Sequence, residues 1–185
     1  MRKRKQFKGV RGPRQLGSNL ITDIPVIERI SRQSEDDDFD FRVYLKFECD
    51  LSDRELDETV RETVDEVWQK IDCTTCANCC KTLIIPVTDG DITRLSNRLK
   101  ITRAEFSTAY LTKDADGDKV LASQPCVFLG ADNRCTVYED RPEVCRDFPF
   151  LYKDDFRSRS LSVIDNSSLC PIVFNVWHRL KQTLR

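Results

Sequence analysis

The sequence has few of the residues on which hydrolytic and phosphate-binding sites depend. It contains a single histidine, His178, and only six glycines in 185 residues. We find no glycine-rich phosphate loop, no Ser-His-Asp set and no pair of catalytic carboxylates. His178 falls in a helical pattern, where a polar helix residue is a simpler interpretation than a metal ligand. A nucleophilic triad or a nucleotide-binding loop is therefore not expected.

Long apolar runs are also missing. No stretch approaches the roughly 18 apolar residues of a membrane-spanning helix, and the basic N-terminus lacks the apolar segment of a secretory signal. Lysine and arginine total 30 against 31 acidic residues, so no overall field draws the protein toward nucleic acid. We expect a cytoplasmic protein without membrane contact, with nucleic acid disfavoured and a redox or other protein partner that the sequence does not identify.

Cysteine, in contrast, is abundant. The segment CTTCANCC, from Cys73 to Cys80, holds four cysteines in eight residues, and no ordinary core needs that many sulfur atoms in one turn of backbone. An odd total of nine cysteines and an adjacent pair fit a disulfide framework poorly, and clustered thiols in a reducing compartment are more often metal ligands. We interpret the segment as a metal-binding loop. Four further candidate ligands follow it: Cys126, Cys135, Cys145 and Cys170.

The spacing C-x2-C-x2-C allows three thiolates to surround one metal or cluster, because each two-residue spacer lets the backbone curl around it. Bacterial ferredoxins use this spacing with a remote Cys-Pro as the fourth ligand, and Cys170-Pro171 provides such a pair here. Zinc sites normally use two C-x2-C knuckles separated by a dozen or more residues. The arrangement indicates an iron–sulfur cluster, [4Fe–4S] in the ferredoxin pattern, with zinc as the alternative.

Two separate centres would explain the adjacent pair Cys79 and Cys80, whose side chains diverge in extended backbone. We hypothesise that Cys73, Cys76 and Cys79 hold one centre with a distant partner. Cys80 then joins Cys135 and Cys145 near a second centre.

Two arginines near the later cysteines are candidate cofactor-binding residues. Arg141 and Arg146 could offset the negative charge of a thiolate cluster or hold an anionic substrate. The alternative is a surface ion pair with Glu139, Asp140 or Asp147.

Sequence patterns predict a small α+β domain that is cysteine-rich and metal-stapled, mainly helical, with short strands and a hairpin. We expect residues 1–38 to be a mostly disordered basic and acidic tail, and residues 39–185 to form a single metal-binding domain. Within the tail, Arg2 to Arg14 is either a solvated segment or a nucleic-acid arm. Strict alternation predicts a strand from Phe39 to Phe47, with Cys49 as a small core residue beyond it.

Local signals predict the remaining elements. The expected elements are helices beginning near Ser52, Thr88, Thr102 and Pro171, a strand over 82–87, a turn over 114–118 and a hairpin over 125–138.

Four separated motifs carry a resemblance to a known family. CTTCANCC, PCVFL, RCTVYEDRPEVCRDFPF and the late Cys-Pro resemble the YkgJ-type cysteine-cluster family, a zinc- or iron-chelating domain with a CxxCxxCC signature. The resemblance covers roughly residues 70–175 and implies eight cysteine ligands, with iron–sulfur or zinc as cargo. Asn78 departs from the glycine often found in this loop, although asparagine tolerates left-handed backbone. The family is also related to flagellin lysine methylases, an activity not transferred to this chain.

The leading hypothesis is an iron–sulfur protein that acts in electron transfer or as an accessory or modifying enzyme. The alternative is a zinc-stapled structural or protein-interaction module without catalysis. A third hypothesis is a cluster enzyme whose open iron site binds a substrate or S-adenosylmethionine. The sequence therefore leaves open whether the protein is an enzyme.

Overall fold

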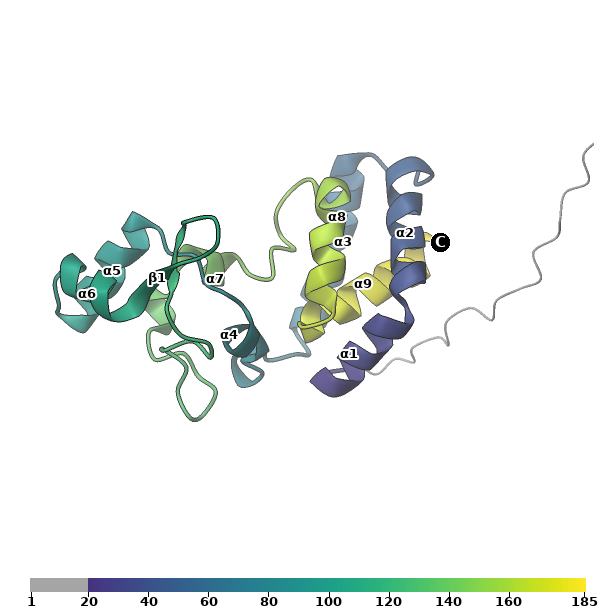
Figure 1. Cartoon of the computed structure of the whole chain (residues 1–185). Coiled ribbons are helices and arrows are strands. Elements are labelled where there is room, and N and C mark those ends of the chain that lie inside the picture. The colour runs from purple at the N-terminus through teal and green to yellow at the C-terminus, as the bar shows by residue number, and fades with distance from the viewer. Residues whose placement is uncertain (1–19) are drawn as a thin grey trace, which may run out of the picture.

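The computed structural model describes residues 20–185, which fold into two lobes (Figure 1). One lobe is a bundle of helices from the beginning and the end of this range, and the other is built from the middle of the chain. The predicted fold class is confirmed, because the described chain is mainly helical with a two-stranded antiparallel sheet. The basic segment Arg2–Arg14 lies outside the described residues.

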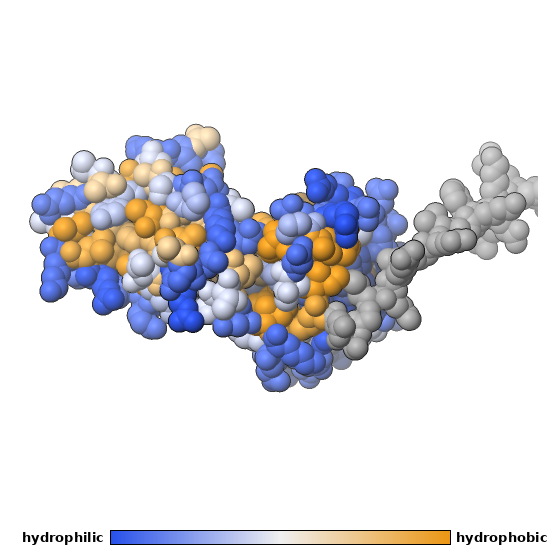
Figure 2. Space-filling view, turned by 90° about the horizontal axis from the view of Figure 1, so that it is seen from below, coloured by the Kyte–Doolittle hydropathy of each residue, from blue (hydrophilic) through white to orange (hydrophobic). Residues whose placement is uncertain are grey.

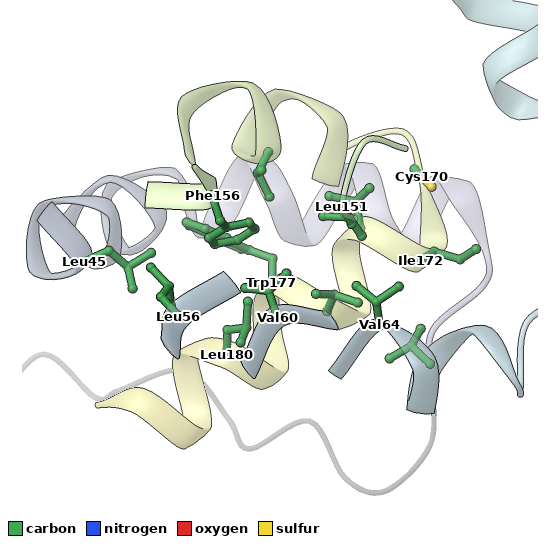
Figure 3. Packing of buried hydrophobic residues seen from close by; sticks show 14 of the residues in the cluster. Leu45, Leu56, Val60, Val64, Leu151, Phe156, Cys170, Ile172, Trp177 and Leu180 are labelled. Atoms are coloured by element: carbon green, nitrogen blue, oxygen red, sulfur yellow. The ribbon is translucent and has the colours of Figure 1, made fainter. Parts of the chain in front are cut away.

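The helical bundle contains five helices and the larger of two hydrophobic cores. Its helices are α1 (Ile24–Gln33), α2 (Glu35–Phe47), α3 (Asp53–Trp68), α8 (Phe156–Ser167) and α9 (Pro171–Leu184). Helix α3 begins with the expected capping box, in which Ser52 and Glu55 bond each other's backbone N–H groups. Trp177 of α9 is fully buried, and Figure 3 shows it among aliphatic side chains from the surrounding helices. Phe41 meets this indole edge to face, with ring centroids 4.9 Å apart.

The expectations for residues 20–47 were wrong in two respects. Residues 24–33 form α1 instead of a disordered tail, and residues 35–47 form α2 across the expected domain boundary at 38 and 39. The alternating pattern that predicted a strand instead gives an apolar face on each side of α2: Phe41 and Leu45 are buried, whereas Phe39 is exposed. Four acidic residues in the first turn stabilise the helix through its dipole, and packing against the bundle decides the conformation.

Two of the acidic residues in the first turn of α2, Asp37 and Asp38, form ion pairs within the bundle and are not fully exposed to solvent. Asp38 is 2% exposed and accepts hydrogen bonds from Trp177 Nε1 at 2.8 Å and from Lys181 Nζ at 2.5 Å. Asp37 accepts from the same ammonium group at 2.5 Å and from Arg185 at 2.7 Å. This network ties α2 to α9, and pairing keeps the buried charges from being left uncompensated.

The second lobe surrounds the smaller core. It contains α5 (Asp89–Leu99), α6 (Arg103–Tyr110), β1 (Leu111–Lys113), β2 (Lys119–Leu121) and α7 (Glu143–Asp147). Capping boxes at Thr88 and Thr102 begin α5 and α6 as predicted. Phe106 of α6 is fully buried in this core, to which α5 contributes Ile92 and Leu95 and to which β2 and the loops contribute the other members.

Strand predictions in this lobe were only partly correct. The segment 85–87 is extended and bonds to β2 through Val87 N–H to Lys119 O and Leu121 N–H to Ile85 O, but 82–87 is not a regular strand. The hairpin of the sheet is β1–β2, which turns at the predicted 114–118 turn. Over 125–138 the chain doubles back with one isolated bridge, Leu129 to Cys135, because the bonded stretch is too short to form regular strands.

No helix among residues 20–185 combines the length and the apolar character needed to cross a membrane.

His178 generates a prediction about acid stability. Its imidazole is 8% exposed and lies 4.3 Å from the Phe174 ring, and burial together with nearby Lys181 lowers the histidine pKa to about 4. The unfolded chain binds this proton near pH 6.5, whereas the folded protein binds it only near pH 4. The free energy of unfolding therefore has its full value above pH 6.5 and decreases as the pH falls toward 4. We expect this to cost wild type about 3 kcal/mol at most.

Urea unfolding followed by tryptophan fluorescence between pH 4 and 8 will test this in wild type and His178→Gln. The stability difference between the two proteins should change in favour of the variant as pH decreases. A constant difference over this range would contradict the buried neutral imidazole.

Candidate metal centre

A cavity of about 650 Å³ brings together all eight cysteines that the motifs single out. The residues that line it come from both lobes, and Figure 2 shows that apolar side chains also reach the surface of both lobes. Cys49 is not among them and instead packs, partly buried, against the bundle core. His178 also lies outside the lining. The lining cysteines are Cys73, Cys76, Cys79, Cys80, Cys126, Cys135, Cys145 and Cys170.

The cysteine loop is formed by two short helical segments. Asp72 caps a 3-10 turn (Cys73–Thr75) by accepting the Thr74 N–H at 2.9 Å, and α4 (Asn78–Thr82) follows. Ala77, with φ of 55°, connects the two in the left-handed region. The left-handed residue is thus Ala77 and not Asn78, which begins α4. This change of direction turns the successive thiols of the loop toward the cavity.

Asn78 joins the loop to the distant cysteine of the bundle. Its side-chain Nδ2 donates a 2.8 Å hydrogen bond to the carbonyl oxygen of Leu169, the residue before Cys170. Cys170 is 7% exposed and is the N-cap residue of α9. Its thiol lies close enough to Cys73 and Cys76 for their charges to affect its pKa. The hydrogen bond therefore holds this remote thiol beside the first part of the loop.

Cys80 faces a different group of thiols. The N–H of Cys126 donates a 2.8 Å hydrogen bond to the carbonyl oxygen of Cys80, which brings the folded-back segment against α4. The Cys145 thiol lies within electrostatic range of Cys80, Cys126 and Cys135. Proximity thus groups Cys170 with Cys73 and Cys76, and Cys80 with Cys126, Cys135 and Cys145. With Cys79 assigned to the former group by the loop spacing alone, we call Cys73, Cys76, Cys79 and Cys170 the first set, and Cys80, Cys126, Cys135 and Cys145 the second set.

The two sets meet at Cys79 and Cys80. Their Sγ atoms are 4.0 Å apart, because both residues lie on α4 and not on an extended strand. The opposite orientation expected for extended backbone does not apply to a helix, in which adjacent side chains are about 100° apart. Cys79 belongs to the first set through the loop spacing, and its sulfur is also a neighbour of the second.

A buried carboxylate fixes the segment that carries Cys145. Asp91, 1% exposed, accepts the Glu143 N–H at 3.0 Å and the Arg94 guanidinium at 2.5 Å. Arg94 also donates to the carbonyl oxygens of Asp140 and Arg141. Burial opposes ionisation of Asp91, but hydrogen bonds from Thr88, Arg94 and Glu143 outweigh it and lower the carboxyl pKa. Neither residue was predicted from the sequence: the threonine three positions before Asp91 was a signal that could have pointed to the carboxylate, whereas no signal pointed to Arg94.

Several thiols of the cavity have raised pKa values and hold their protons tightly. Burial raises the pKa of Cys145 to about 12, with the nearby thiols adding to the effect, and burial likewise raises the pKa of Cys170 to about 12. The pKa values of Cys73, Cys126 and Cys135 are also raised by burial. Metal ligation requires thiolates, so binding must release protons and becomes more favourable as pH rises.

The charge of the cavity lining is of one sign. Among the described residues, those that line it include no aspartate, glutamate, lysine or histidine, and its charged members are Arg134, Arg141 and Arg146. The expected alternative, an ion pair of Arg141 or Arg146 with a neighbouring carboxylate, is not found within residues 20–185. Arg141 instead donates to the Tyr138 carbonyl at 2.6 Å and lies over that ring, 3.9 Å from its centroid. Arg146 donates to the carbonyl oxygens of Glu139 and Arg141.

This donor set fits a thiophilic metal or a cluster. Clustered sulfur ligands favour zinc or iron–sulfur groups, and the arginines offset the negative charge of four-thiolate centres. Within the part of the chain that the structure describes, no three cysteine, histidine or carboxylate side chains are yet arranged to hold a metal ion. Because the thiols come from both lobes, a metal bound by them would couple its binding to the packing of the two lobes.

Comparisons with known proteins agree with this donor chemistry. The model of the CxxCxxCC family, described as "Putative zinc- or iron-chelating domain", matches residues 72–171, which is more than half of the chain. A search of curated proteins and a search of solved structures gave no match.

We predict that serine substitution distinguishes Cys76 from Cys49. Cys76→Ser should abolish metal binding at the first set, because no neighbouring residue of the loop can replace the lost thiolate. Cys49→Ser should leave metal content unchanged and cost about 1 kcal/mol, since this side chain is only partly buried.

Bound iron, zinc and acid-labile sulfide will be measured side by side in both variants and in wild type. A metal-replete Cys76→Ser protein, or a folded Cys49→Ser protein without metal, would refute the assignment.

Proposed function

The chain belongs to the CxxCxxCC family of zinc- or iron-chelating domains, and from this premise we propose that it carries two iron–sulfur centres, each held by four cysteines. The first set would hold one centre and the second set the other, with [4Fe–4S] as the expected type. When bound, such clusters supply one-electron chemistry. We propose that the protein uses it in electron transfer, or as a cluster-bearing accessory or modifying enzyme.

One observation carries this proposal: eight thiols from both lobes line a single cavity of about 650 Å³. That volume is in the range of pockets that hold polyatomic ligands, whereas a zinc ion is enclosed by four sulfurs at roughly 2.3 Å from it. Two polyatomic clusters would fill a cavity of this volume more completely than two single zinc ions would.

The surroundings of the first set support a redox role. Cys73 is exposed, so a centre on this set would lie at the surface and within reach of a partner.

Arg141 lies close to Cys73, Cys135 and Cys145, where its charge partly offsets the rise in the pKa of each thiol that burial causes. We propose that Arg141 and Arg146 bind the cofactor by offsetting cluster charge. The partner is proposed to be a redox protein in the cytoplasm, with no role for membrane or nucleic acid.

A zinc-stapled interaction module is the second candidate, and the Cys79–Cys80 pair favours it. Four sulfurs in a tetrahedron about 2.3 Å from zinc lie about 3.8 Å from one another, close to the 4.0 Å between these two sulfurs. Both residues could then serve one zinc ion, which would merge parts of the two sets.

Anaerobic purification tests the choice of metal. We expect a brown protein with iron and acid-labile sulfide, whose visible absorption bleaches with dithionite. A colourless protein with stoichiometric zinc would refute the iron–sulfur proposal and support the structural module. Growth in iron-supplemented and zinc-supplemented media, with metal content measured in each, controls for metal availability.

The adjacent pair tests the ligand partition. If Cys79 and Cys80 serve different centres, Cys79→Ser and Cys80→Ser should each lose about half of the bound metal, because each breaks one four-thiolate site. The double variant should then lose almost all of it. If one ion is shared, the double variant will retain as much metal as either single variant, which contradicts the two-centre assignment. Cys49→Ser serves as the matched control.

A further inference from the structure

The outer face of α2 carries large apolar side chains that the bundle does not cover. Phe39 is 41% exposed, Val43 44% and Phe47 79%. They are spaced by four residues and therefore form one stripe along the helix. The opposite face, with Phe41 and Leu45, already fills the bundle core. The stripe is thus available for a partner without any change in the fold.

Acidic side chains lie on the same face. At 100° per residue, Asp36 and Asp40 lie on the same side of the helix as the stripe, Asp36 about one turn before Phe39 and Asp40 along its edge. Both are exposed, and neither forms an ion pair with another residue of the described range 20–185. Their neighbours Asp37 and Asp38, in contrast, are bound by Lys181. Lys46 lies on the same side of the helix near Phe47, so the acidic charge is concentrated at the N-terminal half of the stripe. Apolar and basic side chains in a covering segment would complement that half.

The first 19 residues of the chain have this composition. They contain seven lysines and arginines, no acidic residue, and the apolar residues Phe7, Val10 and Leu16. The residues that follow this segment are attached to the bundle. The Ile21 N–H donates to Asn175 Oδ1 at 3.0 Å, and Asn175 Nδ2 donates to the Ile21 carbonyl oxygen at 2.7 Å.

The available length is sufficient. Helices α1 and α2 together span about 35 Å at 1.5 Å per residue, whereas 19 residues extend to about 60 Å. A segment attached at residue 20 can therefore reach any point of the stripe.

We propose that the Phe39, Val43 and Phe47 stripe of α2 is a docking surface for residues 1–19 of the same chain. Apolar side chains of the segment cover the stripe, and its cations pair with Asp36 and Asp40. The contact should weaken at high ionic strength, because the ion pairs are at the surface.

Photo-cross-linking of the full-length protein tests the proposal. With benzoylphenylalanine in place of Phe7, illumination should produce cross-links to the peptide that contains α2, as identified by mass spectrometry. The double variant Phe39→Ser with Phe47→Ser should reduce the yield about tenfold, because most of the apolar contact is lost. Leu161→Ser, an exposed apolar residue on α8, should leave it unchanged.

Mixing ¹⁵N-labelled and unlabelled protein separates contacts within a chain from contacts between copies. Cross-links within single copies support the proposal. It is overturned if cross-links join different copies, if they are absent, or if the double variant leaves them undiminished. Tryptophan fluorescence of each variant verifies that the bundle remains folded, as expected because Phe39 and Phe47 lie outside its core.

Discussion

Convergence of eight thiols between two lobes is the constraint on which the rest of this structure depends. Cys170 enters from the bundle, whereas Cys126, Cys135 and Cys145 pack against the core of the other lobe. The loop from Cys73 to Cys80 runs between them and contributes to both sets. Each set therefore needs a thiol that lies far away in the sequence, and a metal bound there would also fasten segments that are distant along the chain.

Three buried carboxylates provide the fixed framework around this convergence. Asp38 links α2 to α9, and Asp91 holds the segment before Cys145. Asp57 of α3 accepts the N–H groups of Asp155 and Phe156, both at 2.9 Å, and so caps α8 in place of a local side chain. A buried carboxylate with several donors costs much more to disrupt than a surface ion pair, so these anchors fix the segments that flank the thiols.

Few acidic residues lie near the thiols; the exception is Asp72, which adjoins Cys73 and adds to the rise in that thiol's pKa that burial causes. Aspartate and glutamate make up 31 of the 185 residues, yet none of them is in the described lining of the cavity, where arginine is the sole charged residue type. Carboxylates beside thiolates would raise the free energy of the anionic ligand state, whereas guanidinium groups lower it. The arginines therefore offset part of the effect of burial, which keeps these thiols protonated until a metal binds.

Local chemistry in the sequence was enough to determine the helices that begin at Ser52, Thr88 and Thr102, because each capping box acts over four residues. It was also enough to identify the eight cysteines, since spacing and density are properties of the chain itself. Only the tertiary structure decided that residues 39–47 are helical, because their apolar pattern is compatible with a strand and packing against α9 selects the helix. It alone also decided which thiols are neighbours, since Asn78 to Leu169 and Cys126 to Cys80 are contacts between residues that no local pattern relates.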